Sequence, residues 1–244
     1  MSVYRELPVA LPGTVAWAVD RVGGEGAVVL PDGCMDLIWH DGGFLVAGPD
    51  TRAHRTTAAG PRAIGLRFAS GLGPTVLGVA ANELRDTRVP LSALWPDAAV
   101  RRLAGIASQD PLGALVGEVR RRLDPAGLPV EMAIAARLST GAAVSAVAAE
   151  LGWSTRRLHR TSVSAFGYGP KTLARVLRFD RALAAARAGH PFADVAVATG
   201  YADQAHLARE VRALSGTSLS GLVSQPGSAA KRSTWLPSGS VTVA

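Results

Sequence analysis

The spacing of apolar residues changes near Leu72 and divides the chain into a strand-rich part and a helical part. Before Leu72, short apolar runs are separated by clusters of Gly, Pro and Asp, which is typical of antiparallel strands joined by turns. The runs are Val15–Val19, Ala27–Leu30, Leu37–Trp39, Phe44–Ala47 and Ala63–Phe68. Asp41, Gly42 and Gly43 lie between two of these runs and predict a hairpin, because they tolerate positive φ. A β sandwich or an open barrel is therefore expected.

After Leu72 the apolar residues recur at helical spacing, and helices are expected at Ala98–Ala107 and Leu112–Leu123. Residues 124–129 contain two prolines and a glycine, which predict a linker. Helical patterns then continue to residue 223. Residues 224–244 are rich in Ser and Gly without periodicity, and we expect them to be disordered.

A first helix-turn-helix motif is predicted around Ala148 and Gly152. Such a motif needs a small residue where its helices cross and a residue that turns left-handed, and these two supply them. Ser154 is a natural N-cap for the second helix, which should end at Gly167. The exposed face of that helix then offers groups for base edges and phosphates: Ser154, Thr155, Arg156, Arg157, His159 and Arg160.

A second motif repeats the spacing with Ala196 and Gly200, and Asp203 can cap its second helix. The residues expected to face DNA there are Gln204, His206 and Arg209. Between the motifs, Pro170–Arg187 predicts a long helix of roughly 27 Å. Such a spacer could hold two recognition helices about one DNA turn (~34 Å) apart.

The expected fold class is accordingly α+β. A β-sandwich or barrel-like domain with terminal helices is expected over residues 1–123, for sensing and dimerisation. An all-α domain is expected over residues 130–223, with two helix-turn-helix motifs joined by a long helix.

The charge is distributed unevenly between these two parts. The net charge of the chain is +7, with −1 in residues 1–136 and +8 in residues 137–244. A basic half joined to a near-neutral half suggests that one part binds nucleic acid and the other binds something else. The single cysteine, Cys34, excludes a cysteine-based zinc cluster. No membrane span or secretory signal is visible, so we expect a cytoplasmic protein with no membrane partner. We also expect no cofactor, no metal and no enzymatic activity.

These residues resemble the AraC/XylS family of bacterial transcription regulators. Residues 148–171 resemble the first motif of the family and the start of its connecting helix, and residues 200–211 resemble the second. The resemblance covers about residues 130–223. It implies a seven-helix DNA-binding domain, and recognition-helix positions that match Arg156, His159, Arg160, Gln204, His206 and Arg209.

The chain departs from this family on both recognition helices. Thr161 and Ser162 stand where the family usually has large apolar residues on the inner face of the first recognition helix. On the second, Glu210, Ala205 and Ala208 leave fewer donors for base edges. The first motif is therefore expected to carry more of the sequence recognition.

Parts of the N-terminal half resemble the β-rich domain that accompanies this motif pair in many actinobacterial-type regulators. The matching stretches are Leu30–Trp39, Val46–Pro49, Gly65–Phe68 and Leu77–Asp86. The ligands of that domain are mostly undefined, so the resemblance implies architecture and little chemistry.

The resulting hypothesis is a transcription regulator that binds double-stranded DNA and responds to an unknown small-molecule effector bound by the N-terminal domain. The candidate effector residues are Cys34, Trp39, His54 and Arg67. The resemblance favours a homodimer, and such a regulator can also contact RNA polymerase. Two alternatives stay open: a redox or alkylation sensor that uses Cys34, and a cupin-like metalloenzyme with an accessory helical domain.

Overall fold

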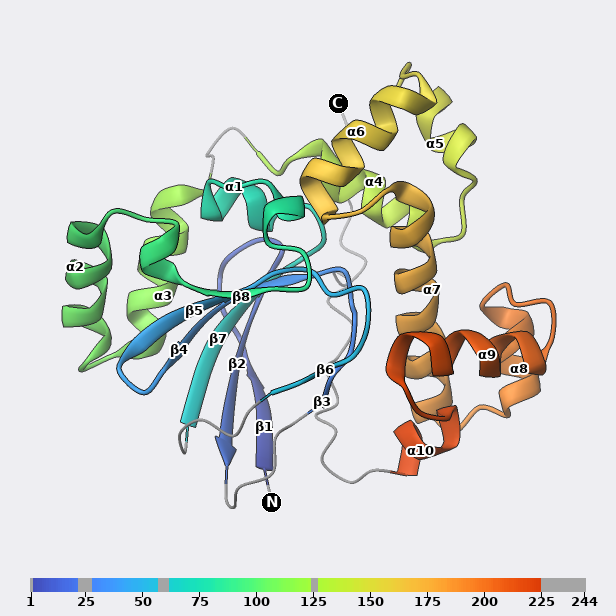
Figure 1. The fold of residues 1–244 in the computed structure, drawn as a ribbon, viewed down its shortest axis with the longest axis horizontal. Helices are drawn as coiled ribbons and strands as arrows, with labels where there is room; N and C mark the ends of the chain where they lie inside the picture. Colours follow the sequence, from blue (N-terminus) through green and yellow to red (C-terminus); the bar gives the residue numbers. More distant parts are fainter. Residues whose placement is uncertain (1, 22–27, 57–61, 124–126, 225–244) are drawn as a thin grey trace.

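A computed structural model describes residues 2–21, 28–56, 62–123 and 127–224. Its N-terminal half is built on one antiparallel sheet beside a two-stranded ribbon (Figure 1). The sheet has the order β1 (Ser2–Leu7), β2 (Thr14–Arg21), β7 (Arg62–Phe68), β4 (Met35–His40), β5 (Gly43–Ala47) and β8 (Arg88–Pro90). The ribbon pairs β3 (Val28–Val29) with β6 (His54–Arg55).

The hairpin between β4 and β5 forms where the sequence predicts it. His40 pairs with Gly43, so Asp41 and Gly42 alone form the loop. Both have positive φ, 47° and 77°, which matches the twist of the flanking strands.

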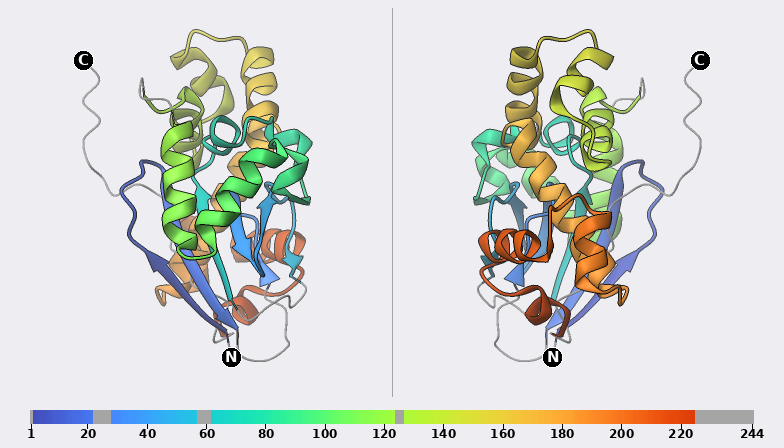
Figure 2. Two further views of the ribbon diagram at one scale, coloured as in Figure 1. Left: turned by 90° about the vertical axis from the view of Figure 1, so that its left-hand side faces the viewer. Right: turned by 90° about the vertical axis from the view of Figure 1, so that its right-hand side faces the viewer.

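The two faces of the sheet have different partners. Ile64, Leu66 and Phe68 on β7 join the main hydrophobic core, which helices cover on one side (Figure 2). These helices are α1 (Gly73–Leu77), α2 (Asp97–Ala107) and α3 (Pro111–Arg122), with short 3-10 turns η1 (Ala81–Glu83) and η2 (Leu91–Ala93). Ala63 and Arg67 alternate with them and face the other side, so one strand serves two different environments.

The C-terminal half is helical throughout its described residues. Its helices are α4 (Val130–Ser139), α5 (Val144–Glu150), α6 (Thr155–Phe166), α7 (Pro170–Arg187), α8 (Phe192–Ala198), α9 (Gln204–Ser215) and α10 (Leu219–Ser224). Within residues 127–224 this gives the seven helices that the family resemblance implies.

Helix α7 supports two separate cores. Leu173 and Leu177 near its beginning pack with α4, α5 and α6, whereas Phe179 and Leu183 pack with α8, α9 and α10. Because both cores share this one rigid helix, α7 fixes the position of the first helix-turn-helix motif relative to the second.

The expected α+β class is confirmed, and the helices predicted at 98–107, 112–123, 155–166 and 170–187 form within a residue of those bounds. The β part is an open sheet with β1 and β8 at its edges. The sequence pattern does not predict strands β1, β6 and β8. Residues 124–126 of the expected linker and the expected tail beyond Ser224 lie outside the described residues, while residues 127–129 of the linker form no helix or strand.

Candidate nucleic-acid interface

The two helix-turn-helix turns have the same backbone geometry. In the first, the amide of Trp153 donates to the carbonyl of Ala148 at 2.8 Å, and in the second the amide of Tyr201 donates to Ala196 at 2.9 Å. Gly152 and Gly200 precede these donors with φ of 64° and 80°, the left-handed conformation that ends the first helix of each pair. The second motif is therefore a structural repeat of the first.

Each recognition helix begins at a side-chain cap. The Ser154 hydroxyl accepts from the Arg157 amide at 3.2 Å, and the Asp203 carboxylate accepts from the His206 amide at 2.6 Å. A buried leucine, Leu158 or Leu207, follows four residues after each cap. The cap follows its glycine by two residues in the first motif and by three in the second, so the two motifs differ by one residue in the turn. The anchoring of the helix after the cap is the same in both.

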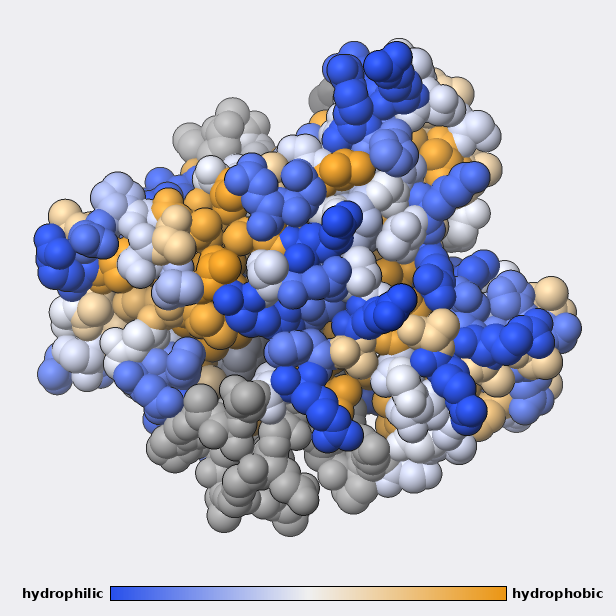
Figure 3. All heavy atoms as spheres, in the orientation of Figure 1, coloured by the Kyte–Doolittle hydropathy of each residue, from blue (hydrophilic) through white to orange (hydrophobic). Residues whose placement is uncertain are grey.

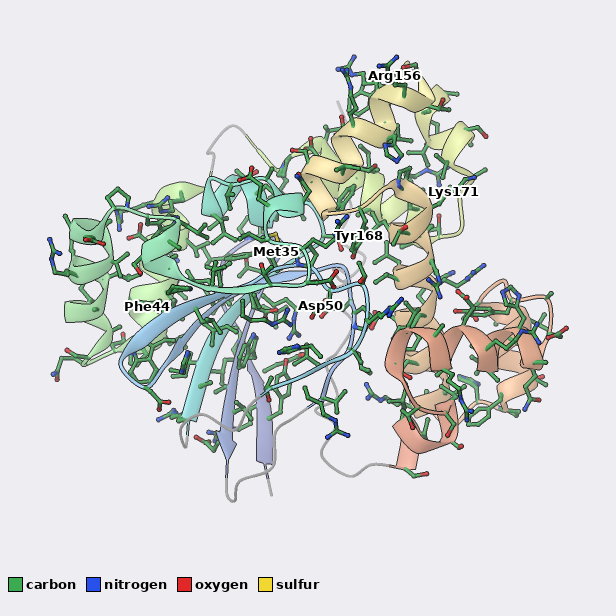
Figure 4. The ribbon with its side chains drawn as sticks, in the orientation of Figure 1. Met35, Phe44, Asp50, Arg156, Tyr168 and Lys171 are labelled. Carbon is green, nitrogen blue, oxygen red and sulfur yellow. The ribbon has the colours of Figure 1, made fainter. Side chains whose placement is uncertain are left out.

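Most side chains predicted to face DNA are exposed. On α6 these are Ser154, Thr155, Arg156, Arg157, His159 and Arg160, and on α9 they are Gln204 and Arg209. Arg156 lies at the tip of the first motif, far from the sheet (Figure 4). The same end of the molecule carries a strongly hydrophilic patch (Figure 3).

Three of the predicted residues also have local structural partners. Ser154 is the cap described above, and Arg157 lies over the Trp153 ring at 4.2 Å. His206 is half-buried, with its ring 5.2 Å from that of Tyr201, edge to face. These contacts preorganise the turns. Arg156 and Arg160 are the exposed arginines of the first motif that take no part in them.

A hollow of about 770 Å³ lies between the first motif and the beginning of α7. It brings Arg156 and His159 together with three residues that the helix-turn-helix pattern does not indicate: Ser145, Lys171 and Thr172. Lys171 is exposed one residue after Pro170, the first residue of α7 (Figure 4). The sequence signal for Lys171 is the predicted start of α7, because Lys171 directly follows Pro170. A cation at an exposed position close to a recognition helix suits contact with phosphate.

Glu210, which follows Arg209 in sequence, does not lie on the exposed face of α9 beside it. Its carboxylate turns to the connecting helix and accepts from Arg175 at 2.6 and 3.2 Å, with Arg178 at 3.9 Å. Arg178 in turn donates to the Gly200 carbonyl and lies over the Tyr201 ring. This network holds α9 and its turn on α7.

In the first motif, Arg137 on α4 holds α5 through Glu150 at 2.5 and 2.8 Å. The hydrogen bond from Arg137 lowers the pKa of Glu150. The departure noted at Ser162 has a cost, because its hydroxyl is fully buried and has no hydrogen-bond partner among the described residues. Thr161 is half-buried.

The C-terminal ends of both recognition helices contact the β-rich half. Arg85 donates to the carbonyl of Gly167, directly after α6, at 3.3 Å. The Ala53 amide donates to the carbonyl of Leu214, in the last turn of α9, at 2.7 Å. The predicted DNA-facing residues lie in the opposite, N-terminal halves of these helices and so stay accessible.

The four candidate effector residues do not form one cluster. Arg67 is buried on β7, with Nε 3.4 Å from Asp36 and 3.5 Å from Asp32. Buried Cys34 lies in the same region, where its amide donates to Asp32. Trp39 instead lies against the main core, and His54 is exposed on the β3–β6 ribbon.

Within the part of the chain that the structure describes, no three His, Cys, Asp or Glu side chains gather as they would around a metal ion. No described helix is both long enough and apolar enough to cross a membrane.

A family model described as a helix-turn-helix domain matches residues 147–225, which span both turns, α6, α7 and α9. The chain carries an AraC-type helix-turn-helix domain. The resemblance of the C-terminal half is thereby confirmed, and this AraC-type domain supports a DNA-binding transcription regulator. A second model, described as a domain of unknown function (DUF6597), matches residues 14–90 in the β-rich half.

Solved structures with a similar course of the chain are those of ToxT from Vibrio cholerae. Apo ToxT of strain SCE256 is 9% identical, with 87% of this chain and 97% of that one covered and a TM-score of 0.45. ToxT of strain O395 bound to (E)-4-(8-methylnaphthalen-1-yl)but-3-enoic acid is 11% identical, with 86% and 97% covered and a TM-score of 0.43. No curated protein matches the chain.

Proposed function

We propose that this protein is a sequence-specific transcription regulator that binds duplex DNA through α6 and α9. The observation that carries the proposal is the repetition of one turn geometry at the two ends of α7, each followed by a capped helix with an exposed N-terminal half. Two such helices on a common support are suited to enter successive major grooves.

The exposed side chains of both helices suit contacts with bases or phosphates. Arg156 and Arg160 can donate two hydrogen bonds each to guanine edges, the commonest specific contact in the major groove. Lys171, across the hollow from Arg156, fits the phosphate backbone. On α9, Gln204 suits adenine and Arg209 suits guanine or phosphate.

The β-rich half is proposed to bind a small-molecule effector and to act on DNA affinity through its contacts with both recognition helices. Arg85 at Gly167 and Ala53 at Leu214 support this, because a shift of the β-rich half would change the placement of α6 and α9 together. The burial of Cys34 disfavours direct oxidation or alkylation of its thiol. A homodimer and contact with RNA polymerase remain predictions.

The test is selection of bound sequences from a random duplex pool with the full chain, followed by affinity measurements on the selected operator. Arg156→Ala should weaken operator binding by roughly 1–3 kcal/mol and relax base preference at one position. Arg101→Ala removes the same charge from the exposed surface of α2 and should leave the affinity unchanged.

Operator affinity should also fall steeply with salt, with a logarithmic slope of about −0.9 per phosphate contact. A pool that yields no enriched sequence, or equal losses for Arg156→Ala and Arg101→Ala, would overturn the proposal.

A further inference from the structure

A pocket of about 320 Å³ lies where the end of the sheet meets the beginning of α3. It is distinct from the buried cluster around Arg67, because it includes Ile64, which alternates with Arg67 on β7 and faces the other side of the sheet. Its wall is apolar and its rim is charged: Leu7, Trp39, Ile64, Pro111 and Leu112 form the wall, and Asp41, Arg62 and Asp110 form the rim.

Rigid elements build this pocket. Trp39 and Ile64 are direct cross-strand partners on β4 and β7. Asp110 caps α3, accepting from the Gly113 amide at 2.9 Å, and Pro111 follows as the first helical residue. The wall is therefore largely preformed, as in small-molecule sites of this size.

The charges on the rim favour a cation. Two carboxylates, Asp41 and Asp110, share the rim with one guanidinium, that of Arg62. Arg62 lies with its Nε 3.5 Å from Asp20, outside the pocket, while Asp41 lies 3.6 Å from Nδ1 of His40 and Asp110 caps α3. The lining side chains keep a formal charge of −1, because two carboxylates face one guanidinium. Trp39 also lines the pocket, and a tryptophan ring attracts positive charge placed over it.

We propose that this pocket binds a small amphiphilic amine. Its apolar body packs against Trp39, Ile64 and Leu112, and its ammonium group lies at the rim that carries Asp41 and Asp110. The chemistry of the pocket indicates the class of the effector, and in that respect this proposal rests on the proposed function. Helix α1 packs against both α3 and α6, so a contiguous path joins the pocket to the first recognition helix.

Calorimetry on the full chain tests the ligand class with three probes of matched shape: phenethylamine, phenethyl alcohol and hydrocinnamate. Phenethylamine should bind about tenfold more tightly than hydrocinnamate, with the alcohol between them. Phenethylamine should also change the fluorescence of Trp39, and the change should be lost in Trp39→Phe. Undetectable binding of the amine, or equal binding of the carboxylate, would overturn the proposal.

Isosteric variants test the rim. Asp41→Asn keeps a residue that tolerates positive φ, and Asp110→Asn keeps a good helix cap, while each removes one charge. Each should reduce the preference for amine over carboxylate several-fold. Asp194→Asn, an exposed acid on α8, is the matched control and should keep the preference. Leu112→Trp should fill the pocket and abolish binding of every probe. Unchanged preference in both rim variants would sink the assignment.

Operator affinity measured with and without phenethylamine separates the two proposals. A shift supports the amine as an effector class, and binding without any shift overturns that role. If no operator can be selected, the proposed function fails while calorimetry still decides the pocket.

Discussion

Glu210 on the second recognition helix accepts hydrogen bonds from Nε and Nη2 of Arg175 on the connecting helix, at 2.6 and 3.2 Å. The side chains are 20% and 38% exposed, so water screens the pair only in part. The contact joins residues 35 positions apart and fixes the rotation of α9 on α7. The orientation of the second motif therefore depends on a bidentate ion pair as well as on its apolar core.

Removal of this pair should destabilise the domain measurably. We expect Glu210→Ala and Arg175→Ala to show a coupling energy of about 1 kcal/mol in a double-mutant cycle, at the upper end of the range of exposed pairs. Urea unfolding of the two single variants and the double variant gives this value. The coupling should shrink in high salt. Strictly additive losses would show that the pair does not hold α9.

The sequence predicts the caps and terminators of the recognition helices because local chemistry determines them. Ser154, Asp203 and Gly167 each act through hydrogen bonds within four residues, and each is found in the predicted role. Pro170 likewise marks the start of α7, since its ring suits a first helical turn.

What the sequence does not predict depends on contacts between distant segments. Strand β8 forms only because β5 pairs with it, and β1 only because β2 does. Glu210 looks like a neighbour of Arg209 in sequence, yet the rotation of α9 turns it toward Arg175. Which face of the sheet each candidate effector residue occupies likewise depends on the pairing between strands, as for Trp39 opposite Ile64 and Asp36 opposite Arg67.

All three tyrosines of the chain, Tyr4, Tyr168 and Tyr201, should resist ionisation in the folded protein. Burial raises the pKa of Tyr4 to about 12, and burial also raises the pKa values of Tyr168 and Tyr201. Unfolded tyrosine loses its proton near pH 10. Above that pH the unfolded state binds fewer protons than the folded state, so stability should be intact below about pH 10 and fall above it.

Two measurements check this alkaline loss. Tyrosinate absorbance should rise only above about pH 10, and the free energy of unfolding should drop over the same range. Tyr168→Phe is the informative variant, because the Tyr168 hydroxyl is buried beside the sheet with no hydrogen-bond partner among the described residues (Figure 4). It should flatten the pH dependence and raise stability at neutral pH by about 1 kcal/mol. Full tyrosinate absorbance near pH 10 in protein that keeps its native circular dichroism would contradict the prediction.

The glycines that end the two recognition helices offer a matched test of the contact between the halves. Gly167 and Gly216 follow α6 and α9 with similar φ values of 83° and 73°, so alanine strains the backbone at both. A Cβ at Gly216 would meet nothing within 4 Å, whereas one at Gly167 would lie 2.6 Å from the Pro49 ring and 3.3 Å from the Ala81 carbonyl.

Gly216→Ala should therefore cost about 1 kcal/mol of stability from backbone strain alone. Gly167→Ala should cost more, because it also forces the β-rich half away from α6, and it should change operator affinity where Gly216→Ala leaves it nearly unaltered. Urea unfolding and operator titration of both variants give the comparison. Equal costs, with equal operator affinity, would mean that the packing of Pro49 and Ala81 on Gly167 is too loose to transmit a change from the β-rich half to the recognition helix.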